Sequence, residues 1–178
     1  MITNLLIFVN FPELILTLGV LTILLISVFI KNSAFKKVSV LSIVLLSIVF
    51  FVTLNSGNIS LFSFNYFFIN SDFIIFFKLL VVLGSIFIII ISYNYFIDLK
   101  VSRFEIPILI IFSTLGMMIL ISSNNLMTMY LGIELQSLSL YVLASIQRNN
   151  IKSAESGIKY FILGALSSGI LLYGCSLI

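Results

Sequence analysis

Six long apolar runs dominate the sequence and restrict what the chain can fold into. Each is near the roughly 20 residues that an α-helix needs to cross the hydrocarbon core of a bilayer. The windows are 11–30, 38–54, 73–97, 106–123, 125–146 and 154–177. Because 61% of the 178 residues are hydrophobic and only 8% are charged, too few polar side chains remain to cover a water-soluble fold. We therefore predict an all-α membrane protein with about six transmembrane helices, forming a single transmembrane domain over residues 1–178.

Basic side chains are confined to alternate connections, which predicts the orientation. Seven of the nine lie in the connections after the first, third and fifth windows: Lys31, Lys36, Lys37, Lys100, Arg103, Arg148 and Lys152. By the positive-inside rule these loops face the cytoplasm or the mitochondrial matrix, and both chain ends lie on the outer, intermembrane-space face. The outer connection from Asn55 to Ser71 alternates loosely between apolar and polar residues, which favours a short interfacial hairpin.

The residue types that are absent exclude several kinds of chemistry. The chain has no His and a single cysteine, Cys175, so we expect no disulfide, iron–sulfur cluster or metal site on it. Its net charge of +3 is scattered, which argues against nucleic-acid binding. The remaining chemistry must use carboxylates, lysines, hydroxyls and water.

Glu134 is the ionisable residue that most requires an explanation, because it lies nine residues into the fifth window. A charge at the centre of a transmembrane helix costs roughly 2.5–3.5 kcal/mol, and no Glu rotamer reaches water from that depth. The same helical face carries a polar stripe that runs from mid-membrane to the inner side and could hold a file of water. Its members are Tyr130, Glu134, Ser137, Tyr141 and Ser145. The alternative is a structural carboxyl satisfied by a neighbouring helix.

Four further charged residues fall inside the windows. Lys159 lies in the sixth, one turn after Glu155, in the orientation that favours an ion pair. If the last two helices are antiparallel neighbours, Lys159 is level with Tyr141 and too far from Glu134 for a direct ion pair, although water could bridge them. Glu13 and Lys78 lie near the outer ends of their windows, where each can be either interfacial or buried.

Two stretches of the C-terminal third closely resemble chain 2 of the NADH:ubiquinone oxidoreductase family, respiratory complex I. They are Met129–Ser145 (MYLGIELQSLSLYVLAS) and Ala154–Gly174 (AESGIKYFILGALSSGILLYG). Phe11–Ile15 (FPELI), and Asp72 with Lys78, are similar to the family's opening spans, so the resemblance extends weakly over the rest of the chain.

The resemblance implies a core membrane-arm subunit of a proton-pumping, H+-translocating enzyme of the respiratory chain, with no redox centre of its own. FMN, iron–sulfur clusters and ubiquinone are then expected on other subunits of the complex. It implies that Glu134 relays protons and that Lys159 joins a hydrophilic axis, with Ser137 and Tyr141 as lining residues of the water file. A Phe-rich, Trp-free composition is typical of AT-rich organelle genes, so we expect the mitochondrial inner membrane.

The chain also departs from the family pattern. Family members have about twice as many helices, and the lysine that partners the key glutamate lies on a helix beyond Ile178. We therefore expect only the N-terminal half of an antiporter-like subunit, with a second polypeptide supplying the rest. The alternatives are a subunit of a multi-subunit cation/proton antiporter and a degenerate structural membrane subunit.

Overall fold

The computed structural model describes residues 11–29, 34–56, 61–63, 67–99, 101, 103–147 and 150–177. It contains α2 (Phe11–Phe29), α3 (Ala34–Asn55), β1 (Leu61–Ser63), β2 (Phe68–Asn70), α4 (Asp72–Asp98), α5 (Glu105–Ser122), α6 (Leu126–Ala144) and α7 (Ile151–Ser176). All six helices are long and apolar enough to cross a membrane, which confirms the predicted fold class. The largest differences from the predicted windows are the earlier starts of α3 and α7.

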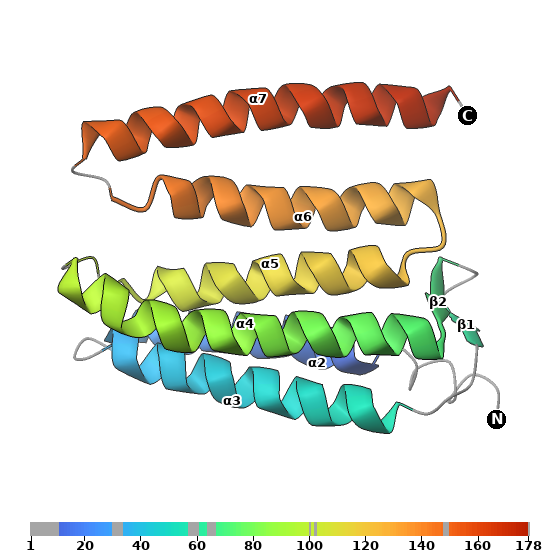
Figure 1. Ribbon diagram of the computed structural model, residues 1–178, viewed down its shortest axis with the longest axis horizontal. Helices are drawn as coiled ribbons and strands as arrows, with labels where there is room; N and C mark the ends of the chain where they lie inside the picture. Colours follow the sequence, from blue (N-terminus) through green and yellow to red (C-terminus); the bar gives the residue numbers. More distant parts are fainter. Residues whose placement is uncertain are drawn as a thin grey trace.

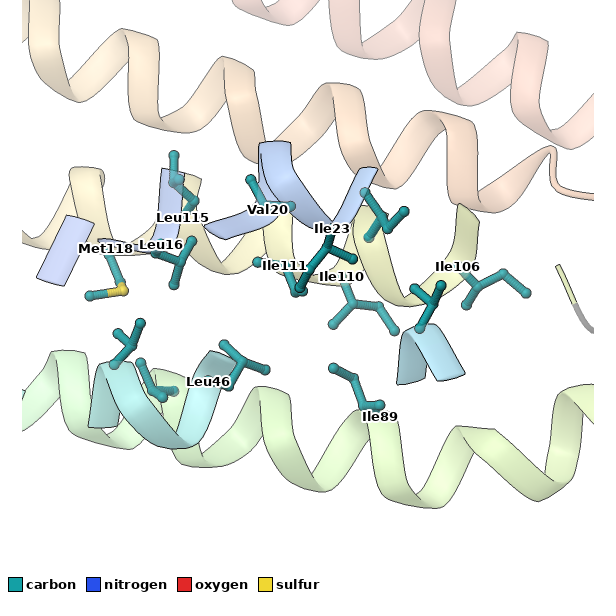
Figure 2. Close-up of a cluster of buried hydrophobic side chains, with 14 of the residues drawn as sticks. Leu16, Val20, Ile23, Leu46, Ile89, Ile106, Ile110, Ile111, Leu115 and Met118 are labelled. Atoms are coloured by element: carbon teal, nitrogen blue, oxygen red, sulfur yellow. The ribbon is translucent and has the colours of Figure 1, made fainter. Parts of the chain in front are cut away.

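Helices α5, α6 and α7 lie side by side in a row, and α2, α3 and α4 gather on the other side of α5 (Figure 1). Helix α5 packs against α2, α3, α4 and α6, whereas α7 packs against α6. The buried side chains of α2–α5 form one apolar cluster (Figure 2). Its fully buried members include Leu16, Val20, Leu46, Val82, Ile111 and Met118. Since lipid tails are as apolar as these side chains, close packing rather than the hydrophobic effect holds the helices together.

The predicted hairpin is present at one end of the helices, called the hairpin end below (Figure 1). Strands β1 and β2 are antiparallel, with Phe62 opposite Ile69. Strand β2 covers the junction between α5 and α6, where Phe68 forms a bridge with Ser123 and the Asn124 amide donates to the Phe67 carbonyl at 2.9 Å. The hairpin therefore fixes the connection that precedes α6.

The opposite end of the helices, called the basic end below, carries the loop cations that the structure describes. Lys36 and Lys37 lie in the first turn of α3, Arg103 precedes α5, and Lys152 lies in the first turn of α7. The other three cations in the predicted pattern, Lys31, Lys100 and Arg148, lie outside the described residues. The alternation of charge thus agrees with the helix directions, while the assignment of the hairpin end to the outer face stays a prediction.

Helix α7 has one packed side and one bare side. Gly157 is its only buried residue among those described. Large apolar side chains on the rest of the helix are exposed, including Leu163, Leu166, Ile170 and Tyr173. This face is apolar enough to contact lipid or further transmembrane helices.

Candidate functional site: a mid-depth carboxyl and a buried ion pair

The carboxyl group of Glu134 lies near the middle of α6. Glu134 is the ninth residue of this helix, about 12 Å from its start and about 15 Å from its end at 1.5 Å per residue. The residue is half-buried, and its Oε2 atom is buried with no hydrogen-bond partner among the described residues. A buried carboxyl oxygen without a partner is costly, so this position needs a cation, a proton or water to satisfy it.

A close crossing of α5 and α6 sets the direction in which Glu134 points. A Cβ atom added at Gly116 would lie 2.7 Å from the Gln136 backbone nitrogen, and one added at Gly132 would lie 2.9 Å from the Leu120 backbone nitrogen. The two backbones are therefore nearly in contact at these glycines. Glu134 follows Gly132 by two residues, a rotation of about 200°, which turns its side chain away from α5.

This crossing makes a testable prediction about stability. Gly116→Ala places a methyl group against backbone atoms that cannot rotate away, so we expect it to destabilise the protein by about 1–3 kcal/mol, as overpacking does. Gly84→Ala is the matched control, because nothing lies within 4 Å of a Cβ added there. Thermal denaturation of the detergent-extracted protein measures both variants. Equal midpoints for the two would contradict the close crossing.

The polar stripe of α6 faces α7. The Tyr141 ring makes edge contacts with Tyr160 and Phe161, with ring centroids 4.8 and 5.8 Å apart, and packs against Gly164. Ser145 packs against Gly157. Glu134 and Ser137 share this face by helical period, and the Ser137 hydroxyl donates to the Glu134 carbonyl at 3.0 Å.

A groove of about 460 Å³ lies between α6 and α7 toward the basic end. It is lined by Tyr141, Val142, Ser145, Ala154, Gly157, Ile158 and Phe161. Two members of the stripe, Tyr141 and Ser145, thus border a space large enough for several water molecules. The proposed roles of Ser137 and Tyr141 as lining residues stay predictions.

Lys159 pairs with Glu155, as their spacing predicts. The Lys159 Nζ lies 2.5 Å from the Glu155 Oε1, and the two side chains are 69% and 57% exposed. Because Gly157 packs against Ser145 and Gly164 against Tyr141, Lys159 lies between the levels of Ser145 and Tyr141, well toward the basic end from Glu134. Within the described part of the chain, Glu134 forms no ion pair with Lys159. A water bridge between them, and the role of Lys159 in a hydrophilic axis, stay predictions.

Glu13 and Lys78 form a buried ion pair, although the sequence leaves open whether each is interfacial or buried. The Lys78 Nζ lies 2.5 Å from the Glu13 Oε1, and the side chains are only 2% and 10% exposed, respectively. Both residues lie within two turns of the hairpin end of their helices, α2 and α4. The sequence shows two opposite charges at similar depth in their helices, which is compatible with an ion pair. It does not show that the two side chains face each other.

The fold and these charges define a class of protein: a multi-pass membrane protein with a mid-depth carboxyl group that has no ion-pair partner among the described residues. Comparison with known proteins shows which family this chain is similar to. The family described as "NADH:quinone oxidoreductase/Mrp antiporter, TM" matches residues 123–178. Subunit N of NADH-quinone oxidoreductase from Pelagibacter ubique is 47% identical over 169 residues, and that from Bartonella bacilliformis is 46% identical over 172. Each alignment covers 94% of this chain, and respectively 36% and 34% of the relative.

A solved structure agrees with these relatives. A chain of respiratory complex I from Thermus thermophilus superposes with a TM-score of 0.77 and 25% identity, covering 93% of this chain and 36% of that chain. The chain is thus homologous to subunit N of NADH-quinone oxidoreductase, which confirms the resemblance to complex I. It spans about a third of the length of these relatives, somewhat less than the half that the sequence analysis predicted. The relatives named here are bacterial and do not test the mitochondrial location.

Proposed function

We propose that this chain is a non-redox part of the proton-translocating membrane arm of an NADH-quinone oxidoreductase, and that Glu134 takes up and releases protons within it. The observation that supports this most is the buried Oε2 of Glu134, which has no partner among the described residues. A carboxyl group in a low-dielectric site exchanges its proton when a nearby cation approaches or withdraws. Redox energy released on other subunits would move such a cation.

The route to Glu134 begins at the groove between α6 and α7 in this proposal. The groove borders Tyr141 and Ser145, and the polar stripe continues from them to Ser137 and Glu134. A proton would enter at the basic end, on the matrix side, and reach the carboxyl along water held by these hydroxyl groups. Lys159 lies at the entrance and would contribute a positive charge to the axis.

The cation that partners Glu134 comes, in this proposal, from the remaining two thirds of the subunit, carried on a second polypeptide. The bare face of α7 is where further helices of that subunit would pack. Other membrane-arm subunits would surround this unit, and FMN, iron–sulfur clusters and ubiquinone would bind elsewhere in the complex. Its place would be the mitochondrial inner membrane.

A native gel of mildly solubilised membranes tests the proposal. We expect the chain to co-migrate with NADH dehydrogenase activity, and mass spectrometry of that band to find a second membrane polypeptide carrying the partner lysine. Co-migration without such a polypeptide would favour a degenerate structural subunit. Absence from every NADH-oxidising band would refute the proposal and favour a cation/proton antiporter, a class that the description of the matching family also includes.

A further inference from the structure

Helix α7 approaches α6 closely at two glycines. Gly157 packs against Ser145, and Gly164 packs against the side chain of Tyr141, whose hydroxyl oxygen is the nearest atom. A Cβ atom added at Gly164 would overlap this hydroxyl, so a larger residue there leaves no room for Tyr141 in its present position. Gly169, by contrast, has nothing within 4 Å of an added Cβ. Gly164 therefore forms a recess in α7 that holds the end of the Tyr141 side chain.

The recess lies closer to the level of Glu134 than the backbone of Tyr141 does. Helices α6 and α7 are antiparallel neighbours (Figure 1). Gly164 follows Gly157 by seven residues, or about 10 Å along α7. The same distance back along α6 from Ser145 reaches a level three residues before Tyr141. The hydroxyl is thus about 6 Å along the axis from the level of the Glu134 Cα, since helical side chains lean toward the N-terminus of their helix.

The ring of Tyr141 borders the groove between α6 and α7. The groove begins at the basic end, where Ser145 follows the last residue of α6 and Ala154 lies in the first turn of α7. Its lining residues farthest from that end are Tyr141 on α6 and Phe161 on α7, and Glu134 is not among them. Tyr141 therefore contacts the groove with its ring and extends toward Glu134 with its hydroxyl.

The Tyr141 side chain stands between groove water and Glu134. Its ring is buried, with edge contacts to Tyr160 and Phe161 at centroid distances of 4.8 and 5.8 Å. A phenol hydroxyl both donates and accepts hydrogen bonds. Among the described residues this hydroxyl has no hydrogen-bond partner, so water is free to bind it. Ser137 offers the next hydroxyl along the stripe, beside Glu134.

We propose that the Tyr141 hydroxyl carries the proton between groove water and Glu134, and that Gly164 positions it for this transfer. A hydronium ion in the groove gives its proton to the phenol oxygen as the phenol proton leaves for water beside Ser137, which protonates the Glu134 carboxylate. Tyr141 is neutral before and after the transfer, and rotation about its C–O bond restores the starting position. This role of Tyr141 rests on the proposed function and deepens it.

Tyr141→Phe removes the hydroxyl and keeps the ring. We expect the assembled complex to pump about tenfold fewer protons per NADH oxidised in sealed vesicles, less than the full contribution of a proton-transferring side chain because water partly replaces the hydroxyl. The remaining pumping should slow more in deuterated water than wild-type pumping does, because proton transfer becomes the slowest step. Tyr160→Phe is the matched control, since it removes a hydroxyl from the neighbouring ring, and its ratio should equal that of the wild type. A wild-type ratio in Tyr141→Phe would overturn the proposal.

Gly164→Ala tests the positioning. The added methyl group displaces the Tyr141 hydroxyl from its recess without removing it, so we expect pumping to fall about as far as in Tyr141→Phe. Gly169→Ala adds the same group to open space on the same helix and should leave pumping unchanged. In Gly164→Ala/Tyr141→Phe the nearest overlapping atom is absent, so the thermal midpoint should partly recover while pumping stays low. Recovery of pumping in this double variant would show that packing alone matters and would contradict the proposal.

Comparison with Glu134→Gln separates the role of Tyr141 from the proposed function. If Glu134→Gln loses pumping and Tyr141→Phe pumps normally, water alone reaches Glu134, and only the role of Tyr141 fails. A normal pumping ratio in Glu134→Gln would overturn the proposed function, and the role of Tyr141 with it.

Discussion

Glu134→Gln is expected to reduce proton pumping by about a hundredfold while the complex still assembles. This factor is the lower end of what a positioned proton-transferring side chain contributes. Gln has nearly the same shape as Glu but cannot take up or release a proton. Because the Glu134 Oε2 accepts no hydrogen bond among the described residues, the substitution removes no contact that holds α6 in place. The measurement is proton uptake per NADH oxidised in sealed vesicles.

Asp98→Asn is the matched control for this experiment. Asp98 is an exposed acid at the end of α4, so its replacement removes the same charge without touching the polar stripe. We expect its pumping ratio to equal that of the wild type. A normal pumping ratio in Glu134→Gln would instead mean that Glu134 is a structural carboxyl, the alternative that its depth alone leaves open.

The helices and the hairpin could be predicted because each depends on local sequence. A membrane fixes the length of an apolar run, and the alternation between Asn55 and Ser71 indicates strands. The helix starts were less accurate because polar residues extend helices beyond the hydrocarbon core. Helix α3 begins at Ala34 and includes Lys36 and Lys37, and α7 begins at Ile151 because the Asn150 side chain accepts a hydrogen bond from the Lys152 amide.

Of the candidate site, helical periodicity could predict only which residues of one helix share a face. The period placed Glu134, Ser137 and Tyr141 on one face, but the glycine contact that turns this face toward α7 depends on two helices and is visible only in the structure. The pairing of Glu13 with Lys78 also depends on how two helices pack. The depth of Glu13 along α2 and of Lys78 along α4 follows from the sequence, whereas the approach of their side chains follows from the packing of both helices against α3 and α5.

Lys78→Met is expected to destabilise the protein by about 3–5 kcal/mol, the usual cost of removing one partner of a buried ion pair. Met fills nearly the same volume as the Lys side chain, so the loss comes from the charge. Glu13 would keep a buried carboxylate with no cation in reach, since Lys78 is its described partner. The expected result is a lower thermal midpoint and less of the chain in the assembled complex on native gels.

Two further variants show whether the loss of stability comes from the charge pair. Neutralising both residues, in Glu13→Gln/Lys78→Met, is expected to recover most of the lost stability, because no unpaired charge remains buried. Ser85→Ala is the packing control: Ser85 is buried two turns further along α4, and its hydroxyl donates to the Val82 carbonyl of its own helix. We expect this change to be nearly neutral. If the double variant were as unstable as Lys78→Met alone, the loss would come from packing around Lys78 and not from the charge left on Glu13.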